Sequence, residues 1–96
     1  TSWVDNVVAL AIENSDIELA ATETESLIVR AVFGGSVASQ RKDNSNFTFA
    51  VESGTSATVD QNGLVTASST AGDTVISVTL KDKPSIVAYA TVSVVE

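Results

Sequence analysis

Apolar and polar residues alternate with a period of two along most of the chain. The segments that show this alternation are residues 8–12, 17–19, 27–33, 47–51, 57–59, 65–67, 76–80 and 86–94. A period of two places every second side chain on the same face of a β-strand, so each segment predicts a half-buried strand. The pattern therefore predicts an all-β chain, in which Val8, Leu10 and Ile12 share one face of the first strand.

Turn signals separate these segments at intervals of about 8–12 residues, which is typical of a β-sandwich. The strongest signal is Asp60-Gln61-Asn62-Gly63. Asn-Gly favours a tight hairpin because both residues tolerate a positive φ. Phe47, Phe49 and Val51 precede this hairpin on one strand face, and we expect Phe49 to lie in the core.

Two segments leave alternatives open. Residues 17–28 contain Glu, Ala and Leu and could form a helix, but the apolar spacing fits 3.6 residues poorly and Thr22 and Thr24 disfavour it. Residues 34–46 form the longest polar stretch, which we interpret as an exposed loop that contains Arg41 and Lys42. Loops of this kind carry function in many proteins.

The length of 96 residues corresponds to about one domain. We find no internal repeat, and 44% of the residues are hydrophobic, as expected for a globular protein. We assign residues 8–96 to a single domain and residues 1–7 to a linker or to the beginning of the first strand. Trp3 lies in this linker, where we expect it to pack on a neighbouring domain.

The net charge of −7 and the shortness of the apolar runs argue against two classes of partner. The basic residues are Arg30, Arg41, Lys42, Lys81 and Lys83. They do not form the clustered basic stripe that phosphate binding requires, so we expect no nucleic acid partner. No apolar run approaches the ~20 residues of a membrane span, so we expect no membrane insertion.

The residues for most catalytic chemistry are missing, since the chain has no His and no Cys. A histidine base, a thiol nucleophile and a thiolate metal site are thereby excluded. We expect no enzyme activity and no cofactor. A calcium site is the remaining alternative if Asp60, Asn62 and Asp73 meet at one end of the sandwich, but no D-x-D-x-D loop is present and a solvated acidic surface is favoured.

Four residues are candidates for contact with a partner at the surface. Arg41 and Lys42 lie in the predicted long loop, and Asp60 and Asn62 lie at the predicted hairpin turn. The basic pair would suit an acidic polysaccharide or a neighbouring subunit. A solvated loop and ordinary turn chemistry explain the same residues without any partner.

The second half of the chain resembles a known family. Residues 57–67 (ATVDQNGLVTA) and 71–78 (AGDTVISV) are similar to the hairpin and following strand of the bacterial immunoglobulin-like domain, group 2, and residues 88–94 are similar to its last strand. The resemblance covers roughly residues 8–95. It departs from the family at Thr22, where Gly is usual, and at residues 36–46, which replace a proline-containing segment.

This resemblance implies an immunoglobulin-like β-sandwich of about seven antiparallel strands in two sheets. It also implies an extracellular location, on the surface of a virion or of a bacterial cell. The expected function is a non-catalytic display module appended to a bacteriophage tail or head protein, with weak adhesion to the host surface. The alternative is an adhesion, carbohydrate-binding or stalk module of a bacterial surface protein. The expected partners are neighbouring domains of the parent protein and a cell-surface glycan or protein.

Overall fold

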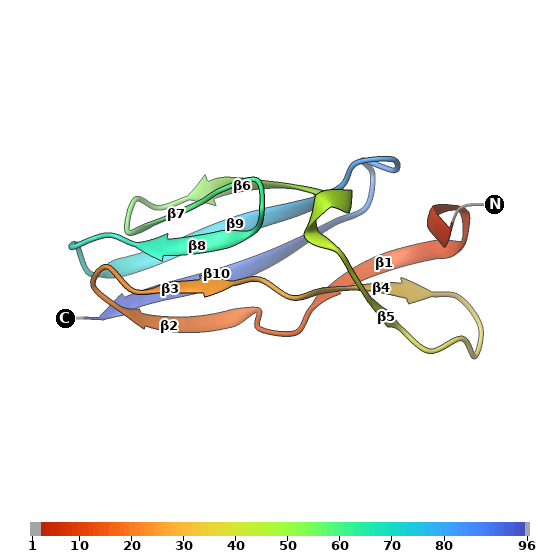
Figure 1. The fold of residues 1–96 in the computed structure, drawn as a ribbon, viewed down its shortest axis with the longest axis horizontal. Helices are drawn as coiled ribbons and strands as arrows, with labels where there is room; N and C mark the ends of the chain where they lie inside the picture. Colours follow the sequence, from red (N-terminus) through yellow and green to blue (C-terminus); the bar gives the residue numbers. More distant parts are fainter. Residues whose placement is uncertain (1–2, 96) are drawn as a thin grey trace.

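The computed structural model describes residues 3–95, which form ten β-strands and two short 3-10 helices (Figure 1). The elements are η1 (Trp3–Asn6), β1 (Val7–Ile12), β2 (Asp16–Ala20), β3 (Thr24–Ser26), β4 (Val29–Phe33), β5 (Gln40–Lys42), η2 (Asn44–Asn46), β6 (Phe47–Ser53), β7 (Ala57–Val59), β8 (Leu64–Ala67), β9 (Gly72–Leu80) and β10 (Val87–Val95). The predicted all-β class is confirmed. Residues 17–28, for which a helix was the alternative, contain β2 and β3 instead.

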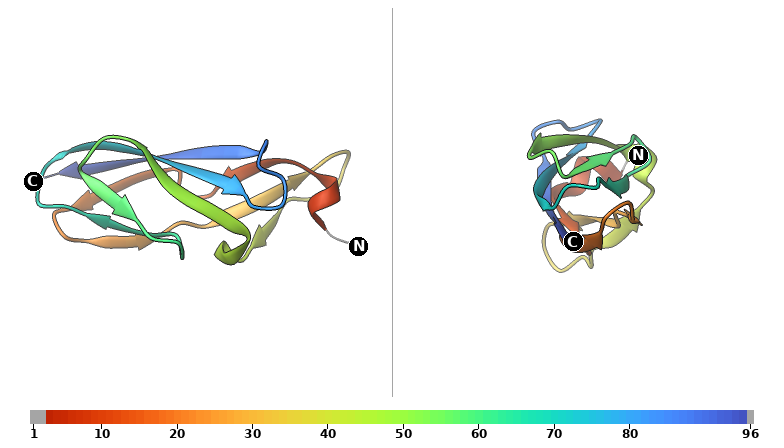
Figure 2. Two further views of the ribbon diagram at one scale, coloured as in Figure 1. Left: turned by 90° about the horizontal axis from the view of Figure 1, so that it is seen from above. Right: turned by 90° about the vertical axis from the view of Figure 1, so that its left-hand side faces the viewer.

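The strands form two layers with the core between them, as predicted for an immunoglobulin-like sandwich. One layer is the sheet β2-β10-β9-β6. The other consists of two ladders, β1-β4-β5 and β3-β8-β7, which are joined where the chain runs from β3 directly into β4. The two layers are visible in the end-on view (Figure 2).

The expectation that all strands are antiparallel is wrong for one pair, because β2 runs parallel to β10. The predicted segments 8–12 and 17–19 correspond to β1 and β2, which residues 13–15 separate. Strand β1 pairs with β4, whereas β2 pairs with the end of β10 in the other layer. The predicted segment 27–33 corresponds to β4. Strand β3 precedes it and β5 lies within the predicted loop, so the chain has more strands than the expected seven.

Buried apolar side chains fill the space between the layers. Phe47 and Phe49 are almost fully buried, and their rings meet edge to face with centroids 6.4 Å apart. The prediction for Phe49 is therefore confirmed. The prediction for Val8 is wrong, because a bulge between Val7 and Ala9 turns Val8 outward, and 62% of its surface is exposed.

The residues before β1 belong to the packed domain. Val4 in η1 is buried in the core, and Trp3 packs against the same core. Residues 3–6 therefore form η1 on the surface of the domain, and Val7 begins β1. The contact of Trp3 with its own domain explains its place at the surface without a neighbouring domain.

The molecule is elongated, with extents of 45 × 21 × 18 Å. The beginning of β1 and the end of β10 lie at opposite ends of the long axis (Figures 1 and 2). We call the end with η1 and residues 34–39 the N-terminal pole. We call the end with the turn at residues 21–23, the turn at residues 54–56 and the end of β10 the C-terminal pole.

Candidate functional site

The predicted hairpin turn at Asp60–Gly63 connects β7 to β8. The Asp60 carboxylate accepts hydrogen bonds from the backbone N–H of Asn62 (2.9 Å) and of Leu64 (3.0 Å). Gly63 has a φ of +79°, which an L side chain rarely adopts. The side chain of Asp60 thus closes the turn on which it lies.

Two amide side chains hold this turn against the domain. Asn44 in η2 donates from Nδ2 to the carbonyl oxygens of Asn62 (2.9 Å) and Leu27 (3.0 Å). Gln61 donates from Nε2 to the carbonyl oxygen of Phe49 (3.0 Å). The sequence analysis did not identify Asn44 or Gln61, because their partners lie 12–18 residues away along the chain.

Arg41 and Lys42 lie on the strand β5 and not in an exposed loop, which corrects the interpretation of residues 34–46. Strand β5 pairs with β4, and Arg41 stands opposite Arg30. Two adjacent guanidinium groups would repel each other, but Glu13 lies between them. Its carboxylate accepts from Arg30 Nη1 (2.8 Å) and from Arg41 Nη2 (2.8 Å), which fixes β5 in place.

This arrangement shifts the titration of Glu13. The hydrogen bonds from Arg41 and then from Arg30 lower the pKa of Glu13 to about 2. The same bond with Glu13 raises the pKa of Arg41. Ionised Glu13 is therefore favoured in the folded protein, and the stability that it contributes is present above the pKa of an unfolded glutamate, about 4.3.

Replacement of Glu13 by Gln should therefore destabilise the protein most at neutral pH. The difference in melting temperature from the wild-type chain should shrink as the pH falls from about 5 towards 2, because the wild-type carboxylate then becomes protonated. Thermal unfolding followed by circular dichroism across this pH range measures the difference in melting temperature. Glu18→Gln on β2 is a matched control, since Glu18 is bonded to neither arginine. An equal difference at pH 7 and pH 2 would contradict the role of Glu13.

The ammonium group of Lys42 lies 4.7 Å from the centroid of the Trp3 ring. It also donates to the side chain of Gln40 (3.1 Å). A cation over an aromatic face is attracted by the ring electrons, so this contact ties β5 to η1. Arg41 and Lys42 thus serve contacts within the domain.

Asp60 and Asp73, the two carboxylates of the calcium alternative, lie at opposite ends of β7. Asp73 precedes Thr74, which is bonded to the beginning of β7, whereas Asp60 follows the end of β7. Each carboxylate has a local partner, and that of Asp73 accepts from Ser93 Oγ (2.9 Å). Within residues 3–95, no three acidic side chains gather into a group that could hold a metal ion.

A groove with a volume of about 560 Å³ lies at the N-terminal pole. It is lined by Trp3, Asp5, Asn6, Val8, Phe33, Gly34, Val37 and Gln40. Val8 and Val37 are 62% and 58% exposed, which is high for aliphatic side chains. The sequence analysis missed this groove, which brings residues 3–8 next to residues 33–40.

The groove has no catalytic arrangement among its residues. Its single carboxylate, from Asp5, has no second acidic group or nucleophile beside it among the lining side chains. The apolar rings and valines favour packing contacts instead. This N-terminal groove is therefore a candidate interaction surface.

Comparison with known proteins agrees with this structural interpretation. The family model of the bacterial Ig-like domain (group 2) matches residues 32–92, from β4 to β10. Domains of this kind are generally non-catalytic and typically occur in surface or extracellular proteins, with structural or adhesion-type roles. No curated protein matches the chain. Among residues 3–95, no helix has the length and apolar character needed to cross a membrane.

Proposed function

We propose that this chain, which belongs to the family of bacterial immunoglobulin-like domains of group 2, is a non-catalytic spacer that holds other domains of a surface protein apart. One observation carries the proposal: the chain enters and leaves at opposite ends of a body that is 45 Å long (Figure 1). Copies joined in series would each add most of this length. A domain with both ends at one pole would add little.

The strand pairing suits a spacer that must resist a pulling force. The end of β10 pairs in parallel with β2, from Thr91↔Asp16 to Val95↔Ala20. A pull on the two ends of the molecule is directed along these strands, so the hydrogen bonds between them are loaded together in shear. Separating them together takes more force than opening them one after another.

We propose that the spacer belongs to the tail or head of a bacteriophage virion, where contact with a host glycan or protein would add weak adhesion. A stalk of a bacterial adhesin with carbohydrate-binding loops is the alternative, and the same spacer geometry supports it. The full gene separates the two, because a virion protein and a row of tandem domains behind a secretion signal have different neighbours. A glycan-array screen of the chain tests the adhesive contact directly.

Small-angle X-ray scattering of one, two and three copies joined end to end tests the spacer. Each added copy should lengthen the maximum dimension by about 45 Å, the long axis of the domain. Increments near the two short axes, 21 and 18 Å, would mean that the copies fold back side by side. That result would reject the spacing function.

A further inference from the structure

We infer that the groove at the N-terminal pole is a docking site for the acidic C-terminal pole of a second copy, so that copies stack head to tail. The inference deepens the proposed function, on which it rests, by naming the partner of this surface. It requires opposite charge at the two poles and exposed apolar surface at the contact.

Charge is segregated along the long axis. Arg30, Arg41 and Lys42 lie on β4 and β5, and Lys81 and Lys83 lie in the turn between β9 and β10. All of these elements occupy the half of the molecule that contains the N-terminal pole (Figure 1). Each arginine in this half is paired with Glu13, and the half also holds Asp5, Asp43 and Asp82, so its five basic and four acidic residues leave a small positive charge of +1.

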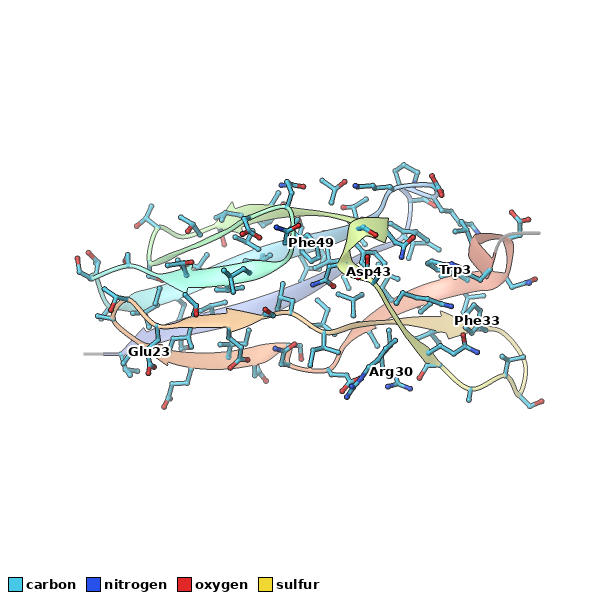
Figure 3. The ribbon with its side chains drawn as sticks, in the orientation of Figure 1. Trp3, Glu23, Arg30, Phe33, Asp43 and Phe49 are labelled. Atoms are coloured by element: carbon cyan, nitrogen blue, oxygen red, sulfur yellow. The ribbon has the colours of Figure 1, made fainter. Side chains whose placement is uncertain are left out.

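The other half is acidic and holds no lysine or arginine among the described residues. Its acidic residues are Asp16 and Glu18 on β2, Glu23 and Glu25 around β3, Glu52 on β6, Asp60 after β7 and Asp73 on β9. All of them are exposed. Glu23 lies at the far tip, in the turn that leads into β3 (Figure 3). Copies in the same orientation along one axis would therefore bring unlike charges together, which favours this register over pole-to-like-pole contact.

Two lysines flank the groove itself. Lys42 lies over the Trp3 ring, which lines the groove. Lys83 donates from Nζ to the carbonyl oxygen of Val7 (3.1 Å), next to the groove residue Val8. The groove thus combines an apolar floor and the single carboxylate of Asp5 with two cationic edges, which suits a partner surface that carries carboxylates beside small apolar side chains.

The C-terminal pole has this composition. Ala20, Ala21 and Val95 are exposed there beside Glu23, and Val95 is 40% exposed at the end of β10. These side chains are small, so the contact between two separate copies should be weak. In an array, the preceding copy is held next to the groove at an effective concentration in the millimolar range, which makes such a contact useful.

Paramagnetic relaxation provides the test, because the chain has no Cys and one introduced Cys can carry a single spin label. Thr70→Cys places the label in the exposed connection near the C-terminal pole. We would mix labelled chain with ¹⁵N wild-type chain at about 1 mM in low salt. The indole of Trp3 and the amides of residues 34–38 should broaden selectively, and the broadening should fade at high salt as the charges are screened.

Two variants of similar exposure locate the contact. Val37→Asp adds a negative charge to the groove and should abolish the broadening. Tyr89→Asp adds the same charge on β10 outside the groove, where Tyr89 is 56% exposed against 58% for Val37, and should leave it unchanged. Dispersed amide spectra verify that both variants are folded.

The outcomes separate this inference from the spacer proposal. Broadening that is absent at the N-terminal pole, uniform over the surface, or equal in wild type and Val37→Asp overturns the docking. Shifts at the groove that arise only with a glycan or another protein overturn it as well, since they name a different occupant. An array that lengthens by about 45 Å per copy without such broadening would keep the spacer and reject the docking.

Discussion

Replacement of Phe49 by Ala should lower the free energy of unfolding by about 3–5 kcal/mol. Phe49 is 2% exposed, lies on β6 opposite Val78, and contacts Phe47 edge to face. The lost ring leaves a cavity between two layers whose backbone ladders prevent collapse. Domains of this size are stable by about 5–15 kcal/mol, so the variant should be close to unfolding at ambient temperature.

Urea unfolding followed by circular dichroism measures this difference. Val51→Ala on the same strand is the control, because Val51 is 40% exposed and its truncation should cost under about 1 kcal/mol. An equally small loss for Phe49→Ala would show that the ring does not lie in the core. If Phe49→Ala is too unstable to purify, Phe49→Leu should give a smaller loss in the same direction.

The burial of Phe49 was predictable because a period of two, once a strand is recognised, divides its residues between core and solvent. The same rule failed at Val8, where a bulge shifts the register of β1 against β4. A bulge depends on the partner strand, so the alternation within one segment does not reveal it. The parallel pairing of β2 with β10 was missed for the same reason, since the two strands are about 75 residues apart.

The candidate surface residues show the same limit. The turn at Asp60–Gly63 was predictable because its hydrogen bonds join residues at most four positions apart. The place of Arg41 on β5 depends on Glu13, which is 28 residues away. The N-terminal groove likewise depends on the meeting of η1 with the end of β4. Local chemistry was therefore visible in the sequence, whereas surfaces built from distant segments needed the fold.

Thr74 joins the two layers near the C-terminal pole through buried hydrogen bonds. It is fully buried, at 0% exposure, and its Oγ1 accepts from the backbone N–H of Ser56 (3.0 Å) and of Ala57 (3.1 Å). A hydroxyl has two acceptor positions and one proton. Since both acceptor positions are used, Thr74 donates its proton to Ser56 Oγ, 2.7 Å away. One side chain on β9 thus accepts hydrogen bonds from both backbone N–H groups at the beginning of β7.

Replacement of Thr74 by Val should lower the free energy of unfolding by about 2–6 kcal/mol. The variant keeps the shape of the side chain but leaves two buried N–H groups without an acceptor, at about 1–3 kcal/mol for each. Thr74→Ser is the matched control, because it keeps the hydroxyl and loses one methyl group, at a cost of about 1 kcal/mol. Urea unfolding gives the energies, and hydrogen exchange should show faster exchange at Ser56 and Ala57 in the Val variant alone. If Val costs no more than Ser, packing and not hydrogen bonding holds β7 to β9 at this position.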